Sequence, residues 1–232
     1  MIKSEIIKRS PLRILEKSIQ GGLKKGEIAV FASRKGVGKT ACLVHVAIDK
    51  LFQGKYVIHV SYASRIDYII NWYEDIFKEI AKKQNLGPSL KTHDEIIKNR
   101  VIMNFNQQGT NTEQVLKSVE AMIKHGEFAA DIVIVDGFDF SKSSIDDLSR
   151  FKDFAEKAGV EIWFSASLKD KKPLLDPKGY PKELENYMKN IDVMITLKYQ
   201  DHSIRLNIAK NREHLNSEKL PLRLDPATFL IA

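Results

Sequence analysis

The chain of 232 residues lacks several features that would place it in other classes of protein. It has one cysteine, Cys42, so it cannot form an internal disulfide or a cysteine-rich zinc site. No apolar run approaches the roughly 20 residues that span a bilayer, and the first residues do not resemble a secretory signal peptide. These absences favour a soluble protein of a reducing cytoplasm, in which Cys42 is a small packing residue.

The chain also lacks any long run of basic residues, although its formal net charge is +7 and its pI is near 9.3. That balance is compatible with nucleic acid, acidic lipid or a polyanionic nucleotide as partner. The lysines are scattered, however, which favours a solvated surface, and no helix-turn-helix or other dedicated nucleic-acid reader is evident. A hydrophobic content of 43% and no internal repeat indicate a single globular domain over residues 1–232.

Strands and helices alternate along the chain, which predicts an α/β fold with a mostly parallel sheet flanked by helices. The expected strands are residues 27–32, 56–61, 100–105, 131–136, 160–165, 192–199 and 203–210, with one or two edge strands within 220–231. The expected helices are residues 40–51, 65–83, 112–125, 144–158 and a short one around 184–188. Two strands joined at residues 200–202 predict a C-terminal antiparallel hairpin. Gly87-Pro88 is expected to break the chain, and the proline-rich stretch 169–181 to form a loop.

A glycine-rich turn between the first strand and the first long helix carries most of the functional information. It fits the phosphate-loop pattern G-x-x-x-x-G-K-[ST] except at the first position, where Ser33 replaces glycine. The residues expected to bind the phosphates are Ser33, Arg34, Lys35, Gly36, Val37, Gly38, Lys39, Thr40 and Ala41. Backbone N–H groups of such a turn, with the following helix N-terminus, surround phosphates. Lys39 is expected to reach the β- and γ-phosphates and Thr40 to ligate Mg²⁺. The alternative is an ordinary strand-turn-helix with surface lysines.

A second part of the phosphate site is expected at Asp136, the last residue of the apolar strand 131–136. A carboxylate there can hold Mg²⁺ through its waters, because open α/β sheets bind ligands at the carboxyl ends of their strands. The alternative is a strand-ending aspartate in a turn, which Gly137 would favour. Asp139 could be a second acidic participant, but we interpret it as a cap for the next helix.

Taken together, the motifs resemble the RecA-like ATPase core, especially its replicative-helicase (DnaB), RadA and circadian-clock KaiC branches. In chain order, the motifs are Gly21-Gly22-Leu23-Lys24-Lys25-Gly26-Glu27, the phosphate loop, the Asp136 strand, Phe164-Ser165-Ala166-Ser167 and Lys210-Asn211-Arg212. The resemblance extends from about Pro11 to Leu230. It implies a RecA-like P-loop NTPase fold, ATP and Mg²⁺ as ligands, and a homo-oligomer with nucleotide at the subunit boundary.

The resemblance assigns a further role to Lys210 and Arg212. Residues i and i+2 of a strand point to one face, so the two side chains are expected to present their charges together. In the resembled families this pair reaches the γ-phosphate bound by the neighbouring subunit. It would then stabilise charge in the transition state as an arginine finger does. The alternative is a solvated basic strand end.

Two departures from the family bear on hydrolysis. Where related proteins carry a water-activating glutamate after the second strand, this chain has Ala63, whose methyl group cannot accept a proton. The family also tends to have a glutamine that senses the γ-phosphate after the later strand. This chain has Ala166 and its serine neighbours in that place. Asp67 lies four residues after Ala63, about one helical turn, and the sequence leaves open whether its carboxylate faces the phosphate site. We therefore expect nucleotide binding with slow or absent turnover.

Other interpretations stay open at this point. The loop is also similar to the deviant loops of ParA and MinD partition ATPases, but their signature lysine stands where this chain has Arg34. The protein could be an active ATPase acting on DNA or RNA in replication, recombination or repair, with Asp67, Asp139 or a partner supplying the base. It could also bind nucleic acid without hydrolysis, or be a scaffold whose site is vestigial. No appended domain is visible beside the core.

Overall fold

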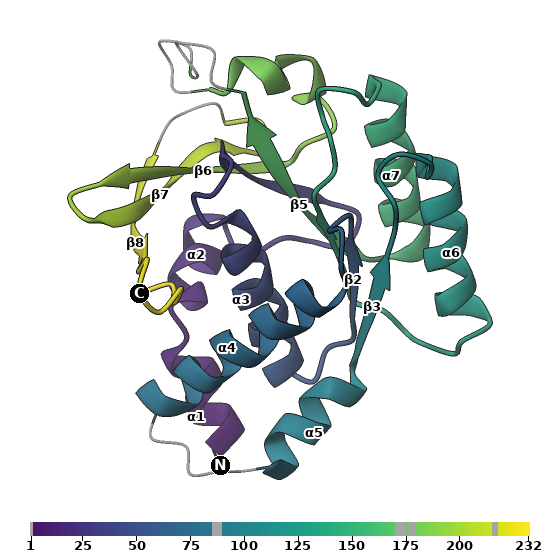
Figure 1. Cartoon of the computed structure of the whole chain (residues 1–232). Helices are drawn as coiled ribbons and strands as arrows, with labels where there is room; N and C mark the ends of the chain where they lie inside the picture. Colours follow the sequence, from purple (N-terminus) through teal and green to yellow (C-terminus); the bar gives the residue numbers. More distant parts are fainter. Residues whose placement is uncertain (1, 85–89, 170–174, 176–179, 215–217) are drawn as a thin grey trace.

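A twisted β-sheet forms the centre of the molecule, and the helices pack on its two faces (Figure 1). The computed structural model describes residues 2–84, 90–169, 175, 180–214 and 218–232. Within them, eight strands are ordered β3-β2-β4-β5-β1-β6-β7-β8. The strands are β1 (Ile28–Arg34), β2 (Val57–Ser61), β3 (Arg100–Asn104), β4 (Ile132–Asp136), β5 (Glu161–Leu168), β6 (Val193–Gln200), β7 (Ser203–Asn211) and β8 (Glu218–Leu224). The strands from β3 to β6 pair in parallel, whereas β6, β7 and β8 pair antiparallel.

This sheet confirms the predicted α/β class with its mostly parallel sheet and C-terminal hairpin. The hairpin turn between β6 and β7 consists of Asp201 and His202, with φ angles of 51° and 58°. Two consecutive positive φ angles define the primed turn whose twist matches that of antiparallel strands. The predicted connection at residues 200–202 is therefore correct, although neither central residue is glycine.

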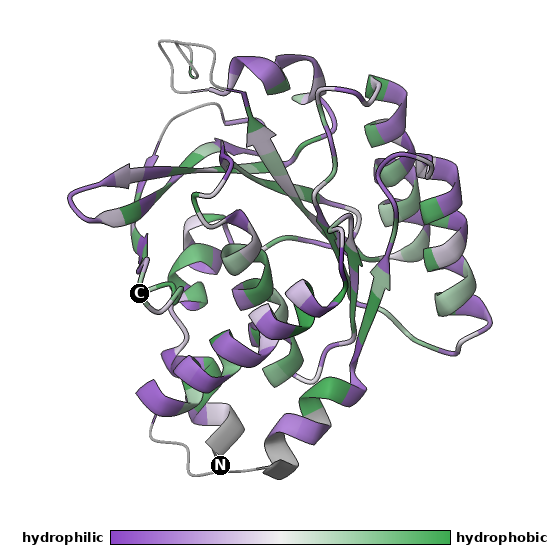
Figure 2. Cartoon of the chain, in the orientation of Figure 1, coloured by the Kyte–Doolittle hydropathy of each residue, from purple (hydrophilic) through white to green (hydrophobic). Residues whose placement is uncertain are grey.

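Helices cover both faces of the sheet, and each face has its own hydrophobic layer. The helices are α1 (Ile2–Arg9), α2 (Leu12–Ser18), α3 (Lys39–Phe52), α4 (Asp67–Lys83), α5 (Leu90–Lys98), α6 (Thr112–Lys124), α7 (Ile145–Ala158) and the 3₁₀ helix η1 (Lys182–Tyr187). Along β1, Ala29 and Phe31 pack toward α3, whereas Val30 packs toward α7. The central strands contribute apolar residues to both layers because both faces are covered, and hydrophobic residues gather at the centre of the molecule in Figure 2.

The helix that follows the phosphate-loop motif is buried along most of its length, because α4 packs over it on the side away from the sheet. Cys42 on this helix is fully buried, which confirms it as a packing residue. Burial raises the pKa of its thiol well above the ordinary value, so the group stays protonated and unreactive. No helix among the described residues has the length and apolar character to cross a membrane.

The structure differs from the sequence prediction in several elements. α1, α2 and α5 were not expected, and β5 runs to Leu168 rather than ending at Ser165. β5 continues because Ser167 pairs with Ser33 of β1, so backbone hydrogen bonding extends a segment whose serines suggest a loop. Gly87-Pro88 and most of the expected loop at residues 169–181 lie outside the described residues. Two described residues of that stretch, Leu175 and Pro181, form an isolated antiparallel bridge.

Candidate functional site

The phosphate-loop motif forms a tight turn between β1 and α3. Gly36 and Gly38 have φ angles of 82° and 111°, in the region that favours glycine. Ser33, which replaces the first glycine of the pattern, is buried in extended backbone within β1. Glycine's conformational freedom is not needed there, so the departure from the pattern does not disturb the turn.

Gly38 is also required by the close approach of the last strand. A Cβ atom at this position would lie 2.3 Å from Leu224 Cδ2 of β8, which leaves no room for a side chain. Gly38 is the N-cap of α3 and supplies no side-chain cap to the first turn. The first N–H groups of α3 are therefore left for an anion, the arrangement by which helix N-termini bind phosphate.

Lys39 lies buried inside the turn rather than on the surface. Its ammonium donates to the main-chain oxygens of Ser33 and Arg34 at 3.2 and 2.8 Å. Burial lowers the pKa of this ammonium to about 8, and the nearby charge of Asp136 only partly offsets that effect. Phosphate oxygens bound in the turn would accept stronger, charge-assisted hydrogen bonds from this ammonium than the neutral carbonyl groups do.

Thr40 and Asp136 meet although they are 96 residues apart in the sequence. Thr40 Oγ1 donates to Asp136 Oδ2 at 2.8 Å. The other carboxylate oxygen accepts from Ser165 Oγ at 2.6 Å, and that hydroxyl in turn accepts from Gly137 N–H at 2.9 Å. β5 lies between β1 and β4 in the sheet, so Ser165 bridges the strand that leads into the loop and the strand that ends in Asp136.

A cavity of about 660 Å³ opens in front of these groups, at the carboxyl ends of the parallel strands. The turn lines it with Lys35, Gly36, Gly38, Lys39 and Thr40, and the ends of β4 and β5 line it with Asp136, Gly137, Ser165 and Ser167. Trp72 of α4 and Phe229 of the C-terminal segment form an aromatic wall, with ring centroids 4.7 Å apart at 81°. The cavity is large enough for a nucleotide-sized ligand.

Gln107 is a lining residue that the sequence did not reveal. It follows β3, and its Nε2 donates to the main-chain oxygen of Gly137 at 2.9 Å. The contact of Ser165 with Asp136 was likewise not predicted. Gln107 follows β3, and Ser165 is the last residue of the strand that the sequence predicts over 160–165. A position at the carboxyl end of a strand is the sequence signal that could have pointed to both residues.

The acidic groups of the cavity are few. Among the described residues, Asp136 and Asp139 are the carboxylates that line it, and Ala63 lines it where the resembled families have glutamate. Asp67 instead accepts hydrogen bonds from Arg65 and is not a lining residue. No group of three or more histidine, cysteine or acidic side chains in the described ranges is placed to hold a metal ion by itself.

The interpretation of Asp139 as a helix cap is wrong. Ser144 is the N-cap of α7, with its hydroxyl accepting from Asp147 N–H, because it stands directly before the helix. Asp139 closes a turn instead, accepting from the N–H and hydroxyl of Ser141 at 3.0 and 2.6 Å. Partial burial raises the pKa of Asp139, but the Ser141 hydrogen bonds outweigh it and lower the pKa overall.

The expectation that Lys210 and Arg212 share one strand face is also wrong. β7 ends at Asn211, and Arg212 turns away with a φ of 54°. The Lys210 ammonium donates to the main-chain oxygens of Met188 and Ile191, both at 2.5 Å. Lys210 pairs with Met194 near the start of β6, so it lies toward the amino ends of the parallel strands, whereas the phosphate-loop motif follows the carboxyl end of β1.

Arg212 is held just as fully within the chain. Its guanidinium forms a two-pronged ion pair with Glu27 at 2.8 and 3.0 Å. It also donates to the main-chain oxygens of Ile19 and Gly22 at 2.8 and 3.0 Å. Glu27 directly precedes β1, so the Gly21–Glu27 motif and the Lys210–Arg212 motif meet in one cluster that joins chain segments.

No protein-family model matches this chain, and no curated protein is significantly similar to it in sequence. The function of this chain is therefore inferred from the geometry of the cavity at the phosphate-loop motif and from the resemblance of the motifs.

Proposed function

We propose that the protein is a RecA-like phosphate-loop protein that binds ATP with Mg²⁺. We further propose that it acts as a nucleotide-dependent regulatory or assembly protein with weak or no hydrolysis. The hydrogen bond from Thr40 to Asp136 carries the proposal, because it brings the two residues expected to share a Mg²⁺ ion to 2.8 Å from one another. The glycine turn and the buried Lys39 beside this pair support it.

The donor set fits Mg²⁺ better than a softer metal. One hydroxyl and one carboxylate are hard oxygen ligands, and Mg²⁺ commonly takes one or two such groups together with substrate phosphates and several waters. Thr40 and Asp136 would hold the ion, which would neutralise phosphate charge. Lys39 and the N–H groups of the Gly36–Gly38 turn would hold the phosphate oxygens.

Weak hydrolysis is supported by the scarcity of a suitable base. Asp136 is engaged by Thr40 and Ser165, and Ala63 offers no acceptor. The lowered pKa of Asp139 makes its carboxylate a poor proton acceptor near neutral pH. Loss of a general base typically costs about two to four orders of magnitude in rate.

Equilibrium binding of ATP tests the proposal. Purified protein is titrated with ATP in the presence and absence of Mg²⁺, and we expect micromolar affinity that depends on Mg²⁺. Lys39→Ala should abolish most of the affinity and Asp136→Asn should remove most of the Mg²⁺ dependence. Lys117→Ala on α6 is the matched control, since Lys117 is exposed and pairs with Glu113 at the surface. Unchanged affinity in Lys39→Ala would reject the proposal.

Assembly is tested separately by sizing the protein in solution. We propose that ATP promotes a homo-oligomer with nucleotide at the subunit boundary. The apparent mass should therefore rise with a non-hydrolysable ATP analogue, relative to protein with ADP or without nucleotide. A mass indifferent to nucleotide, despite tight binding, would leave a nucleotide-binding protein without this mode of regulation.

One observation favours a second candidate, an active ATPase acting on DNA or RNA. Asp139 lines the cavity, so a carboxylate does stand within reach of the space for the phosphates. Steady-state phosphate release, measured with and without DNA and RNA, separates the candidates. Turnover well above background that Asp139→Asn and Asp136→Ala both abolish would favour the active enzyme.

A further inference from the structure

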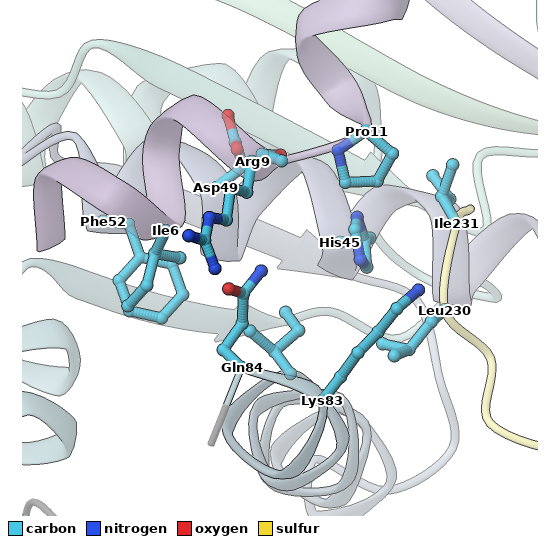
Figure 3. A pocket seen from close by; sticks show the side chains of 12 residues that line it. Ile6, Arg9, Pro11, His45, Asp49, Phe52, Lys83, Gln84, Leu230 and Ile231 are labelled. Atoms are coloured by element: carbon cyan, nitrogen blue, oxygen red, sulfur yellow. The ribbon is translucent and has the colours of Figure 1, made fainter. Parts of the chain in front are cut away.

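A second, smaller pocket lies against the same helix as the phosphate loop, but on the side of α3 that faces α1 and α4 (Figure 3). Its volume is about 60 Å³. Because one water needs about 10–15 Å³ on this measure, the pocket has room for a few heavy atoms of a ligand beneath an open mouth. Ile6, Phe52, Ile80, Leu230 and Ile231 form apolar walls.

His45 is an unsatisfied polar group inside this pocket. It is 4% exposed, and among the residues that the structure describes its buried Nδ1 atom has no hydrogen-bond partner. Figure 3 shows its ring between Pro11 and the end of the Lys83 chain. Burial, together with the positive charge of Lys83, lowers the pKa of this imidazole to about 4, so it is neutral and can carry its proton on Nδ1. Buried polar atoms almost always have partners, so this one points to a ligand.

The charged groups around the pocket select the sign of that ligand. Arg9 of α1 and Lys83 at the end of α4 bring positive charge to its mouth, and the Arg9 guanidinium is directed toward Gln84 (Figure 3). Arg9 pairs only loosely with exposed Glu5, at 3.4 Å. The carboxylate of Asp49 forms an ion pair with Arg13 and accepts a hydrogen bond from Gln53 Nε2.

We propose that this pocket binds a small organic monocarboxylate with an apolar body. The carboxylate would accept from His45 Nδ1–H and lie beside the Lys83 ammonium, while the hydrocarbon part contacts Phe52 and Ile80. A cation is disfavoured by Arg9 and Lys83, a hydrocarbon leaves His45 unpaired, and a polyphosphate does not match apolar walls. The inference is independent of nucleotide binding, although both sites share α3.

Sodium hexanoate is a suitable probe, with hexanol and hexylamine as neutral and cationic analogues of equal chain length. Binding is followed without nucleotide by NMR of the histidine side-chain nitrogens of the full chain. We expect hexanoate to shift the His45 signals saturably, and each analogue to bind about tenfold more weakly. Equal or tighter binding of hexanol or hexylamine would overturn the assignment of a carboxylate, and no saturable His45 shift would overturn the site.

Two variants locate the contact. Lys83→Met keeps the apolar stem and removes the charge, and should weaken hexanoate about fivefold. Lys82→Met, next to it on α4 but not a lining residue, should have no effect. His45→Gln should remove most hexanoate binding, and its fold is checked by circular dichroism. Should His45→Gln fail to fold, the Lys83 and Lys82 pair still decides, because equal affinities in these two variants would contradict the proposal.

Discussion

Two lysines, Lys39 at the carboxyl ends of the parallel strands and Lys210 near their amino ends, have similar hydrogen-bond partners but different surroundings. Lys39 and Lys210 both donate to two main-chain oxygens, and burial lowers the pKa of both. Lys39 lies in a turn with two left-handed glycines and faces a cavity of about 660 Å³. Lys210 lies where η1 ends and β6 begins, next to the Arg212–Glu27 ion pair. A lysine held by carbonyl groups is thus no sign of a phosphate site by itself.

The difference separates the binding role that we propose for Lys39 from the structural contacts of Lys210. At the phosphate-loop end, the contacts of Lys39 can be exchanged for ligand contacts because the cavity gives access to them. At the other end, Arg212 and Lys210 satisfy the carbonyl groups of chain segments that end there, and a partner would have to displace those contacts. Substitutions at the two ends should therefore affect different measurements.

The largest expected effect is on stability, from Arg212→Ala. Removing this guanidinium takes away the charged partner of Glu27 and the donor to two carbonyl groups, in a site where both charged side chains are less than a fifth exposed. We expect the free energy of unfolding to fall by about 3 kcal/mol, measured by urea denaturation, with little change in ATP affinity. Arg205→Ala, an exposed pair with Asp201, is the control and should cost under about 1 kcal/mol. Equal losses of unfolding free energy in the two variants would contradict a structural role for Arg212.

Next in size is the effect of Lys39→Ala on ATP affinity, compared with Lys210→Ala. Loss of the Lys39 ammonium should weaken Mg²⁺-ATP binding about 100-fold, near 2.7 kcal/mol, because charge-assisted contacts to phosphate are lost. Lys210→Ala should lower stability and leave affinity within about twofold. Isothermal titration and urea denaturation of both variants supply the two readouts. Comparable loss of affinity in Lys210→Ala would restore a nucleotide role for that residue.

Substitutions at two glycines of the turn test how closely β8 packs against it. Gly38→Ala places a Cβ 2.3 Å from Leu224 Cδ2 at a positive φ, and should destabilise the protein by about 2 kcal/mol. Gly36→Ala has the positive φ of 82° but nothing within 4 Å of the new Cβ, so we expect about 1 kcal/mol. Thermal or urea unfolding compares them. A larger loss in Gly36→Ala would mean that β8 does not pack on the loop.

The smallest effect is the pH dependence of ATP affinity. Because the pKa of Lys39 is lowered to about 8, its ammonium loses its proton as the pH rises through that value. Only the charged form binds phosphate well, so affinity should fall roughly tenfold between pH 7 and pH 9. The same titration of Lys39→Arg, whose guanidinium stays charged, should show no such fall. A pH-independent affinity in the unmodified protein would contradict the role of Lys39.

The sequence predicted the fold class because the apolar central strands and the helical periodicities are strong local signals. It failed for α1, α2 and α5, whose short length leaves too few turns for a clear pattern, and for the end of β5. Strand pairing of Ser167 with Ser33 decided that boundary, and no local preference of serine encodes it.

The candidate site divides in the same way. The glycine turn, Lys39, Thr40 and Asp136 were found from spacing and from their position at strand ends. Ser165 and Gln107 were not, since each acts through a contact with a residue distant in the sequence. The prediction that Lys210 and Arg212 share a strand face was wrong, because Glu27 and Gly22, which hold the Arg212 guanidinium, lie more than 180 residues earlier in the sequence.

By itself the sequence determined an α/β chain with a glycine-rich turn before the first long helix and an aspartate at a strand end, because those features depend on neighbours along the chain. The tertiary structure decided that Thr40 meets Asp136, that Leu224 closes on Gly38, and that Arg212 pairs with Glu27. The order of strands in the sheet sets all three contacts, and that order arises from packing between segments far apart in the chain.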